Sequence, residues 1–288
     1  MPERIAFKPR KGTVLTPFTA RIILELPLGR PVKVPVDFGL GRAEAVRNDE
    51  GVILTHALGE SMIELGVVKR LAESEKVLFI SAEGDFYFVE IRAKHYYKLM
   101  YLGENVAPTI EIDGVHMHNI KETTPLQDAS RKVGMLRVKR GEVGLDICTG
   151  LGYTAIESLN RGAAVTTIEA DPNVLWIAEH NPFSRKLADA DIVLGDALDV
   201  LDELPEKNFD FALHDPPVFA FSPRLYSREF YAKLHRVLKP GARVFHYTGA
   251  PGRQRGVNIQ RGVAERLRLT GFKIIKVVKG YGILALKT

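Results

Sequence analysis

The chain has 288 residues, 45% of them hydrophobic, and it carries a formal net charge of +5 with a pI near 9.2. This length suits two domains better than one, and the hydrophobic content is enough to fill real cores. No apolar run approaches the roughly 20 residues that a membrane helix needs, and the first residues lack the apolar core of a signal peptide. We therefore expect a globular, cytoplasmic protein.

Cysteine usage and charge narrow the class of protein further. Cys148 is the only cysteine, which excludes an internal disulfide and a cysteine-based zinc site. His116 and His118 would share one strand face, but two ligands without a third predict no metal site. The positive charge favours polyanionic partners such as RNA, although the basic clusters within residues 1–33 and 253–268 are each typical of a solvated face.

The first part of the chain consists mostly of short β-type runs separated by turn residues. The predicted strands cover residues 21–26, 32–37, 52–55, 76–80, 85–91 and 109–118. One helical period intervenes at residues 61–72, where apolar side chains recur at helical spacing. We therefore predict a β-rich N-terminal domain over residues 1–122 that recognises the substrate.

Thr124 can cap a helix whose first residue is Pro125, and this marks a boundary to a second domain over residues 123–288. Strands are predicted at 142–147, 164–169, 191–194, 209–214 and 241–247, alternating with helices at 152–161, 172–181, 196–204, 223–238 and 258–269. The alternation indicates an α/β fold with a doubly wound, mostly parallel sheet. A final hairpin, 272–278 and 281–286, would make one strand antiparallel.

Four carboxylates fall at the carboxyl ends of predicted strands: Asp146, Glu169, Asp196 and Asp215. In an open α/β sheet, ligands bind beyond the carboxyl ends of the strands, and Gly150 and Gly152 allow the backbone to approach a ligand closely. Glu169 is placed to accept both ribose hydroxyls of a nucleotide-type cofactor. Asp196 could accept from the adenine amino group while Ala197 donates its amide, although a helix N-cap is the alternative role for Asp196.

The order of these motifs resembles that of the class I S-adenosylmethionine-dependent methyltransferases, over residues 125–288. Asp146-Ile-Cys-Thr-Gly-Leu-Gly152 is similar to their first motif, Glu169 to their ribose acid, Gly195-Asp-Ala197 to their adenine motif and Lys239-Pro-Gly241 to the turn before their fifth strand. The resemblance implies a seven-stranded sheet with an antiparallel last strand, and S-adenosylmethionine as cofactor. It implies these cofactor-binding residues: Asp146, Thr149, Gly150, Gly152, Glu169, Ala170, Asp196, Ala197 and Asp215. Cys148 departs from the family pattern, in which glycine is common at this position.

Asp215-Pro216-Pro217 resembles the Asp-Pro-Pro motif of amino-methyltransferases. In that family the acid and a main-chain carbonyl accept the two amino hydrogens, and an aromatic side chain stacks on the base. The resemblance implies the catalytic residues Asp215, Pro216, Pro217 and Phe219. Val218 occupies the usual aromatic position, so Phe219 or Phe221 would have to stack. The alternative is a proline-stiffened loop with Phe219 in the core. His214 would point to the opposite face of the strand and is expected to be a packed histidine rather than a base.

These features predict a methyltransferase that acts on an exocyclic base nitrogen of RNA, with the base splayed or flipped into the site. We favour cytosine N4, mono- or dimethylated, in ribosomal RNA over guanine N2 in transfer or ribosomal RNA. Arg253 and Arg255 are candidate RNA contacts.

The strongest rival is a polyamine aminopropyltransferase, because residues 225–241 look similar to that family. Against it, Val218 replaces a second aspartate of that family, and a basic protein poorly suits a cationic substrate. A third possibility is an RNA-binding protein without catalysis. The sequence does not determine the oligomeric state.

Overall fold

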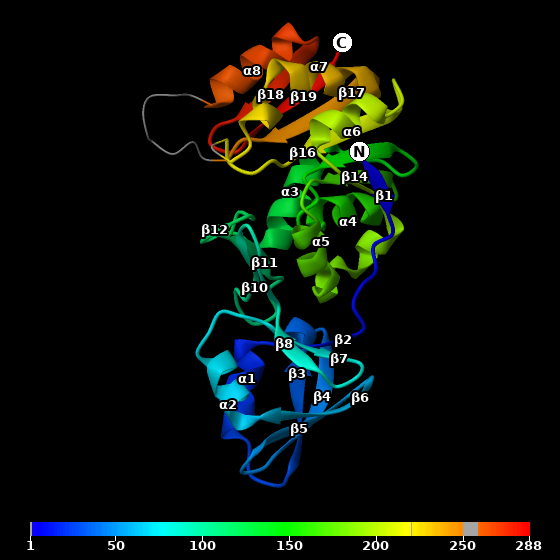
Figure 1. Cartoon of the computed structure of the whole chain (residues 1–288). Coiled ribbons are helices and arrows are strands. Elements are labelled where there is room, and N and C mark those ends of the chain that lie inside the picture. Colours follow the sequence, from blue (N-terminus) through cyan, green and yellow to red (C-terminus); the bar gives the residue numbers. More distant parts are fainter. Residues whose placement is uncertain (1, 220, 250–258) are drawn as a thin grey trace. The chain divides into compact units, whose positions relative to one another are not determined.

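The computed structural model describes residues 2–219, 221–249 and 259–288. Contacts between residues divide the chain into two compact units (Figure 1). Unit 1 comprises Met1–Phe7, Leu126–Pro172 and Lys186–Thr288, and unit 2 comprises Lys8–Pro125 and Asn173–Arg185. Each unit therefore contains one short segment from the far side of the boundary at residues 121–125. Within the described ranges, no helix is long and apolar enough to cross a bilayer.

Unit 1 is built on an eight-stranded sheet in the order β1-β15-β14-β13-β16-β17-β19-β18. The central strands are parallel: β13 (Val143–Ile147), β14 (Ala164–Glu169), β15 (Asp191–Leu194), β16 (Phe209–His214) and β17 (Leu238–Tyr247). β19 (Gly282–Lys287) pairs antiparallel with both β17 and β18 (Phe272–Val278), which confirms the predicted antiparallel last strand. The eighth strand was not predicted, because β1 (Glu3–Ile5) comes from the other end of the chain and pairs antiparallel with β15.

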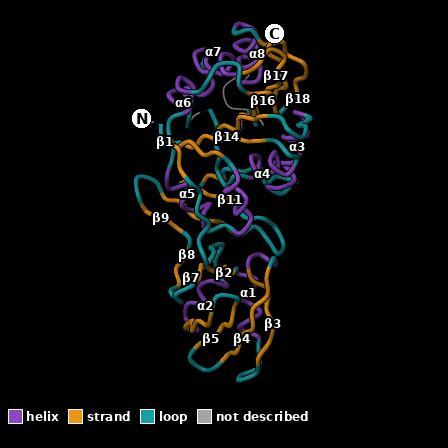
Figure 2. Tube along the Cα trace, turned by 90° about the vertical axis from the view of Figure 1, so that its right-hand side faces the viewer, coloured by secondary structure: helices purple, strands orange, loops and turns teal. Residues whose placement is uncertain are grey.

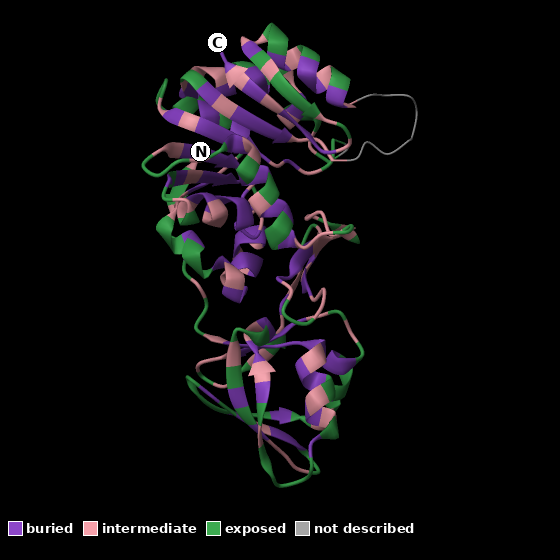
Figure 3. Cartoon of the chain, turned by 180° about the vertical axis from the view of Figure 1, so that it is seen from behind, coloured by how far each residue is buried: buried purple, intermediate pink, exposed green. Residues whose placement is uncertain are grey.

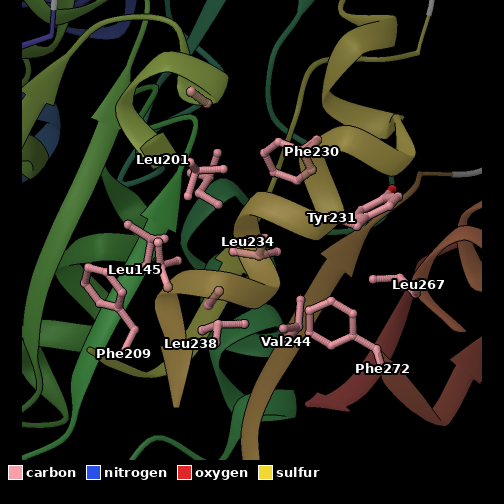
Figure 4. Close-up of a cluster of buried hydrophobic side chains, with 14 of the residues drawn as sticks. Leu145, Leu201, Phe209, Phe230, Tyr231, Leu234, Leu238, Val244, Leu267 and Phe272 are labelled. Atoms are coloured by element: carbon pink, nitrogen blue, oxygen red, sulfur yellow. The ribbon is translucent and has the colours of Figure 1, made fainter. Parts of the chain in front are cut away.

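Helices cover both faces of this sheet (Figure 1). They are α3 (Pro125–Leu136), α4 (Tyr153–Asn160), α6 (Ala197–Glu203), α7 (Arg228–Val237) and α8 (Ile259–Leu269), with a 3-10 turn, η3 (Pro223–Tyr226), before α7. Ser227 caps α7 by accepting from the Phe230 amide, and the apolar face of α7 packs onto the sheet. Side chains from β13, β16, β17, α6, α7 and α8 meet in one buried core (Figure 4).

Unit 2 contains three small antiparallel sheets, shown in orange in Figure 2. The largest is the meander β3 (Pro31–Val36), β4 (Gly41–Arg47), β5 (Gly51–His56) and β6 (Gly59–Glu64). The second is β2 (Gly12–Leu15), β7 (Leu78–Ser81) and β8 (Phe86–Phe88), and the third is β9 (Glu90–Arg92), β10 (Tyr96–Met100), β11 (Thr109–Ile112) and β12 (Val115–His116). Buried and exposed positions alternate most clearly along β4 and β6 (Figure 3), as expected where one face packs on a core.

Two predicted elements of the N-terminal part were wrong. The expected strand at 21–26 is the end of a helix, α1 (Pro17–Glu25), because Thr16 caps it and Pro17 occupies its first turn. The expected helix at 61–72 is helical only from Leu65 to Ala72, as α2. Its first residues extend β6 instead, since pairing with β5 satisfies their backbone groups.

Candidate functional site

The carboxyl ends of three neighbouring strands bring the predicted site residues together. Ile147 at the end of β13 pairs with Ile168 of β14 on one side and with His214 of β16 on the other. The Cys148 amide donates to the Ile168 carbonyl at 3.0 Å, and the Asp215 amide donates to the Ile147 carbonyl at 3.2 Å. The residues that follow these strands are therefore held side by side.

The pKa of the Cys148 thiol indicates that the strand-end acids lie close together. Burial raises the pKa of its thiol well above the usual range, and four carboxylates raise it further. These are Glu169, Asp215, Asp146 and Asp196, the same four acids that the sequence places at strand ends. Their negative charges all act on one side chain, so the four acids lie near a single region of unit 1.

Asp146 ties the glycine loop to the sheet. Its side chain is buried, with one carboxylate oxygen accepting from the Thr154 hydroxyl and the other from the Thr167 hydroxyl, each at 2.7 Å. The Thr149 and Thr167 hydroxyls are 2.6 Å apart, which adds the next loop residue to this network. Burial raises the pKa of Asp146 to about 7, although both hydroxyls favour the charged form. Through these hydroxyls, the Asp146 carboxylate connects the glycine loop and the start of α4 to β14.

The loop itself turns through left-handed backbone conformations. Cys148, Gly150 and Gly152 have φ of 73°, 56° and 79°. Such angles strain any residue with a Cβ, so Cys148 stores strain in a position where glycine would not. A Cβ at Gly152 would lie 2.3 Å from the Leu187 Cδ1, whereas a Cβ at Gly150 would meet no protein atom within 4 Å. Gly152 is therefore needed for packing, and Gly150 leaves its backbone accessible to a ligand.

Glu169 is held by backbone amides. One carboxylate oxygen accepts from the amides of Ala170 and Asp171, at 2.9 and 3.1 Å, and the other accepts from the Gly150 amide at 2.9 Å. Burial raises the pKa of this carboxyl to about 7, while the three amides oppose the rise. Its bond to Gly150 fixes the acid beside the loop that it was predicted to work with.

Asp196 caps helix α6. Its carboxylate accepts from the Leu198 amide at 2.9 Å, which is the alternative role that the sequence left open. The second oxygen lies 3.5 Å from an Arg224 guanidinium nitrogen, and 44% of the Asp196 side chain is exposed. Ala197 follows as the first residue of the helix, with its side chain buried. The cap leaves part of the carboxylate accessible from solvent.

Asp215 forms a buried ion pair that sequence reasoning missed. The Lys132 Nζ on α3 lies 2.6 Å from the Asp215 Oδ2 and 2.8 Å from the Asp128 Oδ2. The same ammonium lies 3.8 Å from the centre of the Tyr247 ring, and the Tyr281 hydroxyl donates to the Asp128 Oδ1 at 2.9 Å. Asp128 and Lys132 are four residues apart on a helix, and this spacing usually marks a solvated pair, so it does not predict their burial.

The segment after Asp215 leaves aromatic side chains on the surface. The Pro217 carbonyl accepts from the Tyr226 hydroxyl at 2.9 Å, and Pro216 is buried. Phe219 packs edge-on against the Tyr226 ring at 5.3 Å and is 42% exposed; Phe221 is 55% exposed. Phe219 therefore lies at the surface and not in the core.

His214 is fully buried on the face opposite Asp215, as predicted. Its ring lies 4.4 Å from the Phe230 ring and 4.3 Å from the His246 ring. Burial lowers the pKa of His214 well below its usual range, so the ring is neutral and serves packing.

Several residues of the N-terminal basic cluster form ion pairs or hydrogen bonds within the chain. Arg4 pairs with Asp191, Arg10 pairs with Glu179 at 3.0 Å, and Arg21 donates to the Ala72 carbonyl at 2.9 Å. Arg253 and Arg255 lie outside the described residues. The two histidines first weighed as metal ligands have other neighbours: His116 lies 3.4 Å from Glu111, and His118 lies 2.8 Å from Thr109.

The fold and the strand-end acids define a class I S-adenosylmethionine-dependent methyltransferase. A family model described as "Methyltransferase domain" matches residues 145–241, which contain the glycine loop and all four strand-end acids. The predicted enzyme class and cofactor are thereby confirmed. The accessible backbone at Gly150 fits such a ligand, since a Cβ there would meet only open space.

Among known proteins, the chain is 44% identical over 232 residues to the uncharacterized protein MJ1233 of Methanocaldococcus jannaschii, covering 79% of this chain and 80% of that protein. It belongs to the same family as MJ1233. Polyamine aminopropyltransferase 2 of Streptomyces coelicolor is 34% identical over 111 residues, 35% of this chain and 20% of that enzyme. The solved spermidine synthase from Thermotoga maritima shares the fold, with a TM-score of 0.53 and 16% identity over 71% of this chain and 75% of that one.

Proposed function

We propose that the protein methylates an exocyclic amino nitrogen of a base in RNA, with cytosine N4 of ribosomal RNA as the target. The observation that carries this proposal is the position of Asp215-Pro216-Pro217. The motif directly follows β16, next to the glycine loop, and leads into the exposed rings of Phe219 and Phe221. An acceptor, a rigid loop and accessible aromatic rings are the parts needed to hold a planar amino group.

The chemical difficulty is that the lone pair of a base amino group is delocalised into the ring. When bound, S-adenosylmethionine supplies an electrophilic methyl group on a sulfonium. The Asp215 carboxylate and the Pro216 carbonyl would each accept one amino hydrogen, which localises the lone pair on nitrogen. Phe219 or Phe221 would stack on the base and fix its plane. Positioning and fixed dipoles of this kind lower barriers by several kcal/mol, so no strong base is needed before transfer.

The protein residues that would hold the cofactor are those of the glycine loop and the two acids that follow. Gly150 offers accessible backbone, Glu169 would accept from the ribose hydroxyls and Asp196 from the adenine amino group. We propose unit 2 as the RNA-recognition part, working through phosphate contacts, and the cytoplasm as the place of action. The net charge of +5 supports a polyanionic substrate.

Nucleoside mass spectrometry tests the substrate. Purified protein, labelled S-adenosylmethionine and ribosomal RNA should yield N4-methylcytidine or its dimethyl form, and Asp215→Ala should abolish the product. Asp199→Ala, an exposed acid on α6, is the matched control. Label in N2-methylguanosine would support the guanine alternative, and no label in any RNA would overturn the proposal.

The second candidate is aminopropyl transfer to a polyamine. It is favoured by the similarity to the Streptomyces enzyme and by the fold shared with spermidine synthase. Against it, Val218 replaces an aspartate of that family. If the RNA proposal holds, incubation with decarboxylated S-adenosylmethionine and putrescine or spermidine should not produce a polyamine with an added aminopropyl group. Stoichiometric release of methylthioadenosine with a new polyamine would establish this candidate instead.

A further inference from the structure

We propose that Lys132 is a positioning residue that also sets the substrate class: it binds one oxygen of Asp215, leaves the other to accept from the amino group, and selects neutral amines over cationic ones. This inference rests on the proposed function, because it concerns the acceptor of the same reaction. The observation behind it is the chain of contacts from Asp128 through Lys132 to Asp215, inside unit 1.

The ammonium of Lys132 is fixed by its surroundings. Its side chain is 4% exposed, and its contacts point to Asp128, to Asp215 and to the face of the Tyr247 ring. An ammonium has three hydrogen-bond donors, and an aromatic ring face attracts a cation, so two carboxylates and one ring stabilise the charge of Lys132. Asp128 is fixed in turn by the Tyr281 hydroxyl. Helix α3 thus holds the Lys132 ammonium against the Oδ2 atom of Asp215.

This placement gives the two oxygens of Asp215 different tasks. Oδ2 accepts a charge-assisted hydrogen bond of 2.6 Å from Lys132, while 20% of the Asp215 side chain stays exposed. The carboxylate cannot rotate without breaking that bond. Oδ1 is therefore presented in one orientation, which a single amino hydrogen can use.

Charge then determines the class of amine. Two carboxylates, Asp128 and Asp215, share one ammonium, so Lys132 halves the negative charge that would otherwise attract a second cation to Asp215. A protonated polyamine at Asp215 would lie close to the Lys132 ammonium, and repulsion between these two cations opposes its binding. A neutral amino group meets no such penalty, because it brings only a hydrogen-bond donor.

The protonation of Asp215 follows the same contacts. Burial raises the pKa of this carboxyl, Lys132 lowers it, and the negative charge of Asp128 raises it. Removing Lys132 should therefore raise the pKa of Asp215, and removing the charge of Asp128 should lower it. Only the ionised acid accepts hydrogen bonds through both oxygens. The two variants should thus move the acidic limb of activity in opposite directions.

The experiment compares Lys132→Met, Lys132→Arg and Asp128→Asn with the matched control Lys186→Met, a lysine whose partner is an exposed asparagine. Transfer to RNA is measured as kcat and KM against pH, together with the carboxyl carbon titration of Asp215 by NMR. Lys132→Met should lower kcat roughly 10- to 100-fold at neutral pH, as expected for a residue that orients a catalytic group. In Lys132→Met the acidic limb of the kcat–pH profile and the titration of Asp215 should move to higher pH. In Asp128→Asn both should move to lower pH. Lys132→Arg should recover part of kcat.

Polyamine binding supplies the specificity readout. In calorimetry, spermidine should bind Lys132→Met more tightly than the unsubstituted protein, while affinity for S-adenosylmethionine stays the same. The inference would be overturned if Lys132→Met and Asp128→Asn shifted the acidic limb of the kcat–pH profile and the pKa of Asp215 in the same direction. It would also be overturned if neither variant shifted them. If the unsubstituted protein transfers no methyl to RNA but the titrations move oppositely and spermidine binding rises, the proposed function fails and the role of Lys132 stands.

Discussion

Glu169 ends β14 and Asp215 follows β16, the two strands on either side of β13, and the two acids are held in different ways. Three backbone amides from neighbouring loops hold the Glu169 carboxylate. A side chain 83 residues away in the sequence holds the Asp215 carboxylate. Backbone amides keep their positions when side chains change, whereas a buried ion pair depends on each partner. The cofactor half of the site is therefore robust, and the reacting half is open to tuning by substitution.

The sharpest test of this comparison exchanges the two acids for alanine. Asp215→Ala should lower the rate of methyl transfer roughly 10²–10³-fold, the usual effect of removing one group that stabilises the transition state. The family resemblance also counts Asp215 among the cofactor-binding residues, but its replacement should weaken binding of S-adenosylmethionine less than replacement of Glu169 does. Glu169→Ala should instead weaken cofactor binding at least about tenfold, because the charge-assisted hydrogen bonds that we propose between Glu169 and the ribose would be lost. Calorimetry and single-turnover rates measure both, and equal effects of the two variants on binding would break the distinction.

The glycine loop separates packing from ligand contact. Gly152→Ala should lower the free energy of unfolding by about 2–4 kcal/mol, from left-handed strain and overpacking against Leu187. Gly150→Ala should cost only the strain, about 1–2 kcal/mol, and should weaken cofactor binding more. Denaturant unfolding and calorimetry measure the two effects. A loss of stability at Gly150 as large as that at Gly152 would contradict the accessible backbone inferred at Gly150.

The buried acid below the loop predicts a pH dependence of stability. Burial raises the pKa of Asp146 to about 7 from an ordinary value of 3.8, so the folded state binds a proton that the unfolded state has lost. Its contribution to stability is complete below pH 4 and is lost as the pH rises through 7. The fall in the free energy of unfolding between pH 4 and 7 should be smaller in Asp146→Asn by at least about 1.4 kcal/mol, the equivalent of one pKa unit.

Asp210→Asn is the control for this decline. Despite some burial, the pKa of Asp210 is lowered by Lys239 and by the Val143 amide, so Asp210→Asn should lose stability above pH 4. Denaturant midpoints between pH 4 and 8 measure both variants. Parallel curves for Asp146→Asn and the unsubstituted protein would show that Asp146 remains ionised in the fold.

The smallest effect is expected at Cys148. Cys148→Gly relieves left-handed strain but adds backbone entropy to the unfolded chain, so stability should change by no more than about 1 kcal/mol. The high pKa of the thiol also predicts slow alkylation at pH 8 in the native protein and rapid alkylation in denaturant. Mass spectrometry follows the single cysteine, and fast native labelling would show that the four carboxylates do not surround it.

Local signals carried most of the fold of unit 1. The alternation of strands and helices, the glycine loop and the terminal hairpin are set by residues close in sequence, and the antiparallel β19 follows from its hairpin with β18. In unit 2 local signals were weaker. The apolar run at 21–26 suggested a strand, but the cap at Thr16 and packing of Ala20 and Ile23 made a helix.

From chain order and strand periodicity one could predict that the four acids and the glycine loop lie at one edge of the sheet, because parallel strands align their carboxyl ends there. Tertiary structure alone decided which groups hold those acids. Lys132 reaches Asp215, and β1 joins β15, only because distant segments meet in the folded chain. Such contacts leave no periodic trace, since burial of an i,i+4 ion pair depends on what packs over it and not on the helix that carries it.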